Sequence, residues 1–368
     1  MQIVRRCARG PPTSRRSKNF LIATTSGRCC ASKASGSQPL RGTAVSEAAL
    51  RFDWRWLLPR RWPLWLALWL MRRLAARDYS SLLVFGTRLG DFARRLPLPQ
   101  RRVVSRNLSL CFPQMTQFDR QRLLQQHFRE SGVTLPETAL AWFAPPKKLL
   151  ELVRFEGIDV FDRLTASGRG VILLAAHFTT LEIGARFITA AREVHAVYKP
   201  SKDPLLSWFF RKYRGAVAAS MIASDDIRAM VRVLKAGGAV WYAPDQAFRA
   251  KGAEMVPFFG IPVATNTATS RLARLTGAAV LPYFVERLPG TAGYVVRIGE
   301  PLQDFPGVDA IADTLRHHAL IENEVRRLPQ QYLWLHKRFK GLGQDYPDYY
   351  SRRYVEPGRR GTSHEQKH

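Results

Sequence analysis

VILLAAHFTTLEIGARFITAA, at residues 171–191, is the part of the chain from which the fold is most readily predicted. Its first six residues, 171–176, form an unbroken apolar run of the length of a buried strand, and Phe178–Ala191 has the apolar spacing of a helix. A strand that is apolar on both faces is typical of a parallel sheet covered by helices on both sides. This stretch therefore predicts a strand, a turn and a helix of an α/β domain.

The same alternation of short apolar runs and helical segments continues along the chain. Further strands are predicted at Val194–Tyr198, Ala239–Ala243 and Ala278–Val285. Helices are predicted at Phe118–Trp142, with an interruption around Pro136, and at Pro204–Arg214, Asp225–Ala236, Thr267–Leu275 and Val308–Leu328. We therefore expect an α/β fold with a mostly parallel central sheet flanked by helices.

The segment before this domain carries the strongest membrane signal. Five of the nine tryptophans lie between Trp54 and Trp69, and an uncharged run from Trp62 to Met71 has a pair of arginines on each side. Ten helical residues rise ~15 Å, about half the thickness of a hydrocarbon core, so this run is too short to span a membrane alone. Indole rings favour the headgroup level and arginines favour anionic lipid. We predict an N-terminal helix in the membrane interface, with a buried core helix as the alternative.

The overall charge predicts anionic partners without choosing among them. Lys and Arg number 57 against 29 Asp and Glu, a formal charge of +28, which attracts nucleic acid, anionic lipid or acidic protein. A nucleic-acid-binding protein would need aromatics interleaved with arginines on a sheet, or a known helix motif, and the sequence has neither. The four cysteines show no CxxC spacing, so neither a zinc site nor a disulfide framework is predicted.

His177 is the first candidate for catalysis. It follows the strand at 171–176, where ligands gather in open parallel sheets. Residues five apart in one helix point about 140° from each other, so Glu182 can meet His177 only if the histidine lies in the turn before the helix. A carboxylate bonded to one imidazole nitrogen leaves the other free to take a proton from a hydroxyl. We predict such a pair, although the same spacing also occurs around structural histidines.

The residues around His177 narrow the choice, because AAHFTTLEIG at 175–184 resembles the HxxxxE block of the late acyltransferases of lipid A biosynthesis, the lauroyl/myristoyl transferase family. That block is a variant of the HxxxxD motif of glycerolipid acyltransferases. Further blocks stand in the family's order: RNLSLCFP at 106–113, LPETALAWF at 135–143, YKPSKDPLLSWF at 198–209, WYAPDQ at 241–246, VPFFG at 256–260, ATNTATSRLARLTGAAVLP at 264–282 and QQYLWLHKRFK at 330–340. Together they cover roughly residues 50–340 and are far more specific than any single block.

The resemblance implies a reaction and its participants. His177 would be the general base and Glu182 its orienting carboxylate. The donor would be an acyl thioester on acyl carrier protein, and the acceptor a 3-hydroxyacyl group on a phosphorylated, Kdo-bearing lipid A precursor. Because the tetrahedral intermediate expels a thiolate, no protein nucleophile, metal or cofactor is expected. The enzyme would work at the cytoplasmic face of the inner membrane, where it would contact anionic lipid. The alternative is a related membrane acyltransferase that acylates a glycerolipid or an amino-lipid from coenzyme A thioesters.

Composition and apolar pattern divide the chain into four parts. Residues 1–48 hold nine Lys and Arg, seven Ser and one acidic residue, and are predicted to be a disordered tail or an extension from a start codon placed too far upstream; a transit peptide is the alternative. Residues 49–95 would be the membrane-anchoring helical segment, 96–348 the acyltransferase domain and 349–368 a polar C-terminal tail.

Further residues are candidates for substrate binding. The family commonly has Arg at the position of Lys199, which keeps the charge for a phosphate but lacks the bidentate fork. Asp245 and Gln246 follow a predicted strand and should face the cleft, where they could bind the acceptor sugar, although Asp245 could equally brace a turn. Arg186 lies one turn after Glu182 and could pair with it. The last candidates, which could form the wall of an acyl groove or a plain core and turn, are Phe258, Phe259 and Gly260.

Overall fold

The computed structural model describes residues 52–215, 218–351 and 354. The chain divides into two units, Met1–Arg41 and Gly42–His368, and all the described residues belong to the second. The tail predicted at 1–48 lies outside the described residues, as does most of the tail predicted at 349–368.

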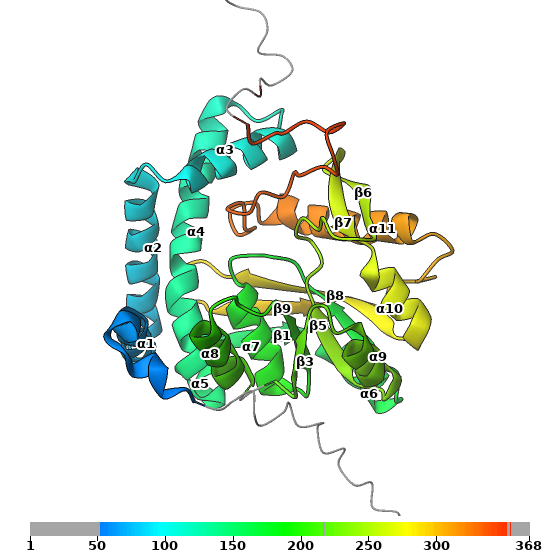
Figure 1. The fold of residues 1–368 in the computed structure, drawn as a ribbon, viewed down its shortest axis with the longest axis horizontal. Helices are drawn as coiled ribbons and strands as arrows, with labels where there is room; N and C mark the ends of the chain where they lie inside the picture. The colour runs from blue at the N-terminus through cyan, green and yellow to red at the C-terminus, as the bar shows by residue number, and fades with distance from the viewer. Residues whose placement is uncertain (1–51, 216–217, 352–353, 355–368) are drawn as a thin grey trace, which may run out of the picture. The chain divides into compact units, whose positions relative to one another are not determined.

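A seven-stranded sheet forms the centre of the domain (Figure 1). Its strand order is β1-β9-β8-β2-β5-β3-β4, and every neighbouring pair is parallel except β8 with β9. The strands are β1 (Val153–Glu156), β2 (Val171–Leu174), β3 (His195–Tyr198), β4 (Met221–Ala223), β5 (Ala239–Tyr242), β8 (Ala279–Arg287) and β9 (Tyr294–Ile298). A separate antiparallel hairpin joins β6 (Ala253–Phe258) to β7 (Ile261–Asn266). The predicted α/β fold with a mostly parallel sheet is therefore confirmed.

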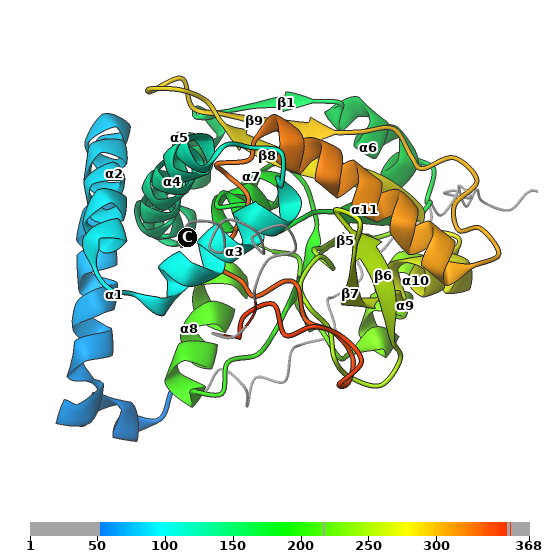
Figure 2. The same ribbon diagram turned by 90° about the horizontal axis from the view of Figure 1, so that it is seen from above.

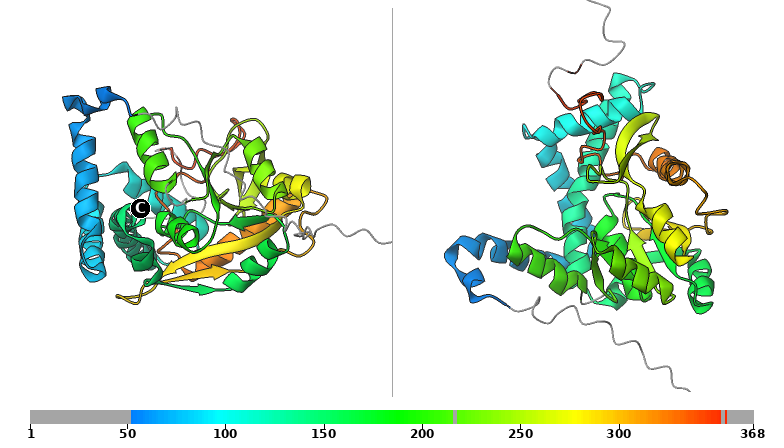
Figure 3. Two further views of the ribbon diagram at one scale, coloured as in Figure 1. Left: turned by 90° about the horizontal axis from the view of Figure 1, so that it is seen from below. Right: turned by 45° about the vertical axis from the view of Figure 1, so that its right-hand side comes forward.

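Helices cover both faces of this sheet. They are α1 (Trp62–Ala75), α2 (Tyr79–Arg95), α3 (Pro99–Cys111), α4 (Gln117–Phe143), α5 (Pro146–Leu150), α6 (Ile158–Ala166), α7 (Leu181–Ala191), α8 (Pro204–Gly215), α9 (Ile227–Lys235), α10 (Ala268–Thr276) and α11 (Ala310–Arg327). Figure 3 shows α11 passing beside the β6–β7 hairpin, which it contacts, as it does α10.

Strand β2 shows why the sheet is buried on both sides. All four of its residues are buried, and alternate side chains enter different cores. Val171 and Leu173 pack with residues of α4, α6 and α7, whereas Ile172 and Leu174 pack with residues of α9 and α10. Because successive side chains of a strand point to opposite faces, an unbroken apolar run is required here.

Helix α4 continues through Pro136, so the predicted interruption is wrong. A proline inside a helix removes one hydrogen bond and usually kinks it. Here tertiary contacts hold the helix before and after the proline. A Cβ atom at Gly132 would lie 2.2 Å from the carbonyl oxygen of Gly86 on α2, so the two helices pack in backbone contact. One turn after the proline, Leu140 is buried in the main core.

The Trp-rich segment forms helix α1, which has a packed face and an exposed face. Leu68 is buried against α8, while Trp62, Leu66, Trp69 and Leu70 are each more than half exposed. Figure 2 shows α1 and α2 along one side of the domain, with α4 between α2 and the sheet. At 14 residues, α1 is about 21 Å long. Among the residues that the structure describes, no helix is both long and apolar enough to cross a membrane.

Candidate active site

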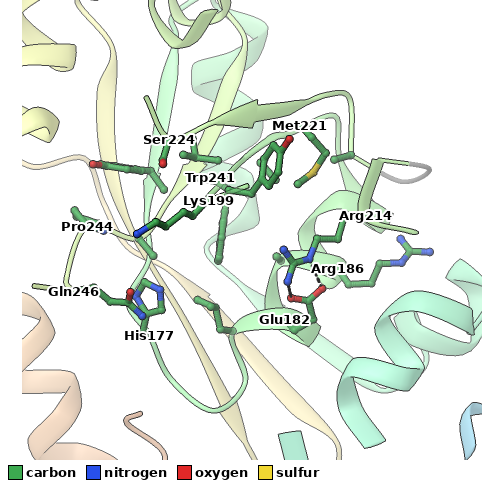
Figure 4. Close-up of a pocket in the computed structure, with 18 of the residues that line it drawn as sticks. His177, Glu182, Arg186, Lys199, Arg214, Met221, Ser224, Trp241, Pro244 and Gln246 are labelled. Carbon is green, nitrogen blue, oxygen red and sulfur yellow. Dashed lines mark hydrogen bonds and ion pairs between the residues drawn. The ribbon is translucent and has the colours of Figure 1, made fainter. Parts of the chain in front are cut away.

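A cavity of about 470 Å³ lies at the carboxyl ends of strands β2, β3 and β5 (Figure 4). This is the edge of a parallel sheet at which ligands usually bind, and the volume lies in the usual range for small-molecule pockets. The polar residues of its lining come from several parts of the chain and include His177, Glu182, Arg186, Lys199, Arg214, Ser224 and Gln246. Apolar and aromatic side chains, among them Trp142 and Trp241, line the rest.

His177 lies in the turn between β2 and α7, as the predicted chemistry requires. Strand β2 ends at Leu174 and α7 begins at Leu181, with Thr180 as its N-cap residue. Backbone hydrogen bonds with residues 331–333 hold this turn in place. The backbone N–H of Leu333 donates to the carbonyl of His177 at 2.9 Å. The N–H of Thr179 in turn donates to the carbonyl of Gln331 at 2.7 Å.

Asp245 is the carboxylate that binds the His177 ring. The imidazole Nδ1 donates to Asp245 Oδ1 at 2.6 Å, and the backbone N–H of His177 donates to Oδ2 at 2.9 Å. The hydroxyl of Tyr332 also donates to Oδ2, at 3.0 Å. Asp245 is only 1% exposed. Burial alone would raise the pKa of this carboxyl, but the His177 ring and its hydrogen bonds more than offset burial and hold the pKa well below its usual range.

This arrangement directs the second ring nitrogen of His177 to the cavity. Nδ1 is occupied by Asp245, the side chain is 19% exposed, and the residue lines the cavity. No hydrogen bond to Nε2 is found among the described residues. An imidazole held this way has a fixed tautomer, with a proton on Nδ1 and a lone pair on Nε2, and can act as a general base.

Glu182 does not bind His177, which corrects the predicted pairing. Its carboxylate accepts from Arg214, at 2.7 Å from Nε and 2.5 Å from an Nη atom, and from the indole N–H of Trp142 at 2.7 Å. Figure 4 shows this carboxylate turned toward Arg214 and away from His177. Because α7 begins only at Leu181, its first turn directs Glu182 toward α8 and α4.

Arg186 does not pair with Glu182 either. Its Nε donates to the backbone carbonyl of Ala141 at 3.1 Å, which ties α7 to α4. The side chain lines the cavity, and burial lowers its pKa. The predicted ion pair one turn after Glu182 is replaced by Arg214 of α8, which already holds both carboxylate oxygens.

The other candidates divide into two groups. Lys199, which is exposed, and Gln246 both line the cavity, as predicted from their positions after strands. Phe258, Phe259 and Gly260 are absent from its lining and form the core and turn of the β6–β7 hairpin. Phe259 and Gly260 both have positive φ, 51° and 75°, as a two-residue hairpin turn requires. The structure thus shows the core-and-turn arrangement that was the alternative, and a role at an acyl groove stays a prediction.

The sequence did not single out several residues that shape the site. Arg214 and Trp142 hold Glu182, Tyr332 holds Asp245, and the Nε2 of His336 accepts from the backbone N–H of Ala247 at 3.3 Å. Burial lowers the pKa of His336 to about 4, so this ring is neutral at pH 7. Trp142 lies in the block LPETALAWF, and Tyr332 and His336 lie in QQYLWLHKRFK. The family blocks therefore contained a signal that could have identified these three residues. Arg214 carried no such signal.

Comparisons with known proteins show which sequences this chain is similar to. A sequence model described as bacterial lipid A biosynthesis acyltransferase matches residues 49–341. The chain is 35% identical over 291 residues to a lipid A biosynthesis palmitoleoyltransferase of Escherichia coli (strain K12), covering 79% of this chain and 95% of that protein. It is 33% identical over 301 residues to a lipid A biosynthesis lauroyltransferase of the same organism, covering 82% and 98%. A lipid A biosynthesis acyltransferase of Haemophilus influenzae is 31% identical over 299 residues, covering 80% and 96%.

Proposed function

The chain belongs to the bacterial lipid A biosynthesis acyltransferases, and from that membership we propose that it moves an acyl chain from acyl carrier protein to a hydroxyl of a Kdo-bearing lipid A precursor. The single observation that best supports the chemistry is the buried Asp245 carboxylate bonded to His177 at the edge of the cavity. The relatives' names include lauroyl and palmitoleoyl transfer, and we propose a lauroyl-type reaction for this chain.

In the proposed reaction His177 is the general base. Its Nε2 takes the proton of the acceptor hydroxyl as that oxygen attacks the thioester carbonyl carbon, and the new C–O bond gives a tetrahedral intermediate. The C–S bond then breaks, and the leaving thiolate takes the proton back from the imidazolium. Asp245 stabilises that imidazolium and keeps the ring in position. Asp245 thus takes the orienting role that the sequence had assigned to Glu182.

We assign the other polar residues of the cavity to substrate placement. Lys199 is an exposed cation, which suits a phosphate of the acceptor, and Gln246 can hydrogen-bond to sugar hydroxyls. Glu182, held by Arg214 and Trp142, fixes the wall that α8 and α4 contribute. Arg186 supports the same wall through its bond to α4.

We propose that the enzyme works at the cytoplasmic face of the inner membrane, in contact with anionic lipid. The exposed tryptophan and leucine side chains of α1 support this, since indole rings favour the headgroup level and the chain carries a formal charge of +28. The same charge suits an acidic carrier protein.

The alternative donor, a coenzyme A thioester used on another glycero- or amino-lipid, can be tested with purified full-length protein in neutral detergent. The same acyl chain is offered on acyl carrier protein and on coenzyme A, with a Kdo-bearing lipid A precursor as acceptor. We expect a higher kcat/KM with the carrier protein, falling as salt rises, because attraction between diffuse charges is screened within about 8 Å at 0.15 M salt. A preference for coenzyme A at every ionic strength would favour the alternative.

The same assay tests the base. His177→Ala should remain folded, because the ring faces a cavity, yet lose about 10²–10⁴-fold in kcat. Circular dichroism checks the fold, and a variant that keeps more than about a tenth of the wild-type turnover would overturn the assignment of His177.

A further inference from the structure

A second cavity, of about 700 Å³, lies between α3, the start of α4 and the linker that precedes α3. Its lining contains four arginines and no aspartate or glutamate, and the arginines are Arg101, Arg102, Arg106 and Arg120. It shares no lining residue with the cavity at His177. A cavity with this lining is a candidate site for an anion.

Among the described residues, no carboxylate neutralises Arg101, Arg102 or Arg120. Arg120 donates to three backbone carbonyls, of which the nearest, Met115, is at 2.5 Å. Arg106 lies over the ring of Tyr354 at 4.7 Å. Arg101 and Arg102 are exposed and form no ion pair with any described residue. Two guanidinium groups are therefore available at the surface, and their forked donors match a phosphate.

Exposed apolar side chains lie in the lining of this cavity or next to lining residues in the sequence. Leu96 is 36% exposed, Leu98, which lines the cavity, is 38% exposed, and Phe118, at the start of α4, is 70% exposed. Phe85 and Phe92 are also exposed along α2, which leads from α1 to this linker. Exposed leucine and phenylalanine beside arginine is the composition of a surface that contacts the membrane interface, whereas a site for a soluble anion needs no such rim.

We propose that the cavity between α3 and α4 binds the phosphate of an anionic lipid headgroup, so that the membrane-contacting surface extends from α1 along α2 to α3. This inference deepens the proposed membrane attachment and rests on it. It gives α3 a function separate from catalysis, that of fixing the orientation of the enzyme on the bilayer. An attachment through α1 alone would leave rotation about that helix free.

The test measures binding of the full-length protein to vesicles of phosphatidylcholine, with and without phosphatidylglycerol. The variant Arg101→Gln/Arg102→Gln removes the two exposed arginines. The matched control, Arg228→Gln/Arg232→Gln, removes two exposed arginines of α9, which form no ion pair with the described residues. Figure 1 shows α9 far from α3. Both variants lose the same net charge. A difference in their vesicle binding therefore shows the effect of where the arginines lie.

We expect the affinity for phosphatidylglycerol vesicles to fall about 30-fold in the α3 variant and little in the α9 variant, from about 1 kcal/mol per arginine near an anionic surface. Turnover in neutral detergent should be unchanged in both. Equal losses in the two variants, or none in either, would overturn the inference. So would a loss in kcat/KM for the acyl carrier protein donor without a loss in vesicle binding, which would indicate protein docking. If the wild type binds no vesicles, the proposed membrane attachment itself fails.

Discussion

Two carboxylates lie within reach of the His177 turn, and their hydrogen bonds give them different roles. Asp245 accepts from the imidazole, from the backbone N–H of His177 and from Tyr332, so every one of its donors belongs to the catalytic turn or to the segment that holds it. Glu182 is bound by a guanidinium and an indole. Only Asp245 can therefore stabilise a proton on His177 directly.

Replacing each carboxylate with its amide separates these roles. Asp245→Asn removes the charge that stabilises the imidazolium and allows the wrong tautomer of His177, so kcat should fall by about 10²–10⁴-fold. Glu182→Gln should act mainly on KM, by loosening Arg214, and should leave the shape of the pH profile unchanged. The measurement is kcat and KM for both variants over a range of pH. A larger kcat loss in Glu182→Gln would restore Glu182 as the partner.

The sequence predicts the position of His177 but not its partner, and the reason is the range of the contacts. A strand followed by a helix start places His177, Lys199 and Gln246 at one edge of the sheet through local pattern alone. The choice between carboxylates depends on Arg214, 32 residues beyond Glu182, and on Tyr332, 87 residues beyond Asp245. No local spacing contains that information.

At the level of elements, a buried ion pair joins helix α4 to strand β8. Arg287 donates to Glu137 through two bonds of 2.6 Å and also contacts Glu130. Tyr294 donates to the same Glu137 carboxylate at 2.7 Å. The side chain of Gln331 then bonds the backbone N–H and carbonyl of Arg287, at 3.0 and 2.8 Å, so the pair is continuous with the segment that holds the His177 turn.

Breaking this pair should destabilise the protein more than breaking its exposed neighbour. Glu137→Gln removes the negative charge that neutralises the buried Arg287 guanidinium. Removing one partner of a buried ion pair lowers the free energy of unfolding by about 3–5 kcal/mol. Glu130→Gln is the matched control, since that side chain is 25% exposed and should cost much less. Urea unfolding of both variants measures the difference. Equal losses would mean that the burial of Glu137 does not set the strength of the pair.

The local pattern predicts some elements and misses others, among them β9, which is buried at four of its five residues, the helix α3 and the hairpin strands β6 and β7. Strands β2 and β5 are buried on both faces, and both were predicted. Strand β1, with four residues and none of them buried, and strand β4, with three residues, were not. Such short strands are stabilised by pairing with β9 and β3, which the local sequence does not encode.

For the whole molecule, the burial of histidines predicts how stability depends on pH. Burial lowers the pKa of His127, His317 and His336 to about 4 and that of His318 to about 3, so all four are neutral in the folded state at pH 7. In the unfolded chain a histidine has a pKa of about 6.5. Between pH 6.5 and 4 the unfolded state therefore binds more protons than the folded state, and stability is lost as the pH falls.

The contribution of one histidine can be isolated with His127→Asn. The Nδ1 of His127 donates to the carbonyl of Gln330 at 3.2 Å, a bond that an asparagine amide can imitate, but its Nε2 contact with Ser131 is lost. The variant should therefore be less stable than the wild type at pH 7. Its free energy of unfolding should fall less steeply toward pH 5, by about 1.4 kcal/mol per pH unit, because one titrating group is gone. Urea unfolding at a series of pH values gives both slopes, and parallel curves would show that His127 takes up no extra proton on unfolding.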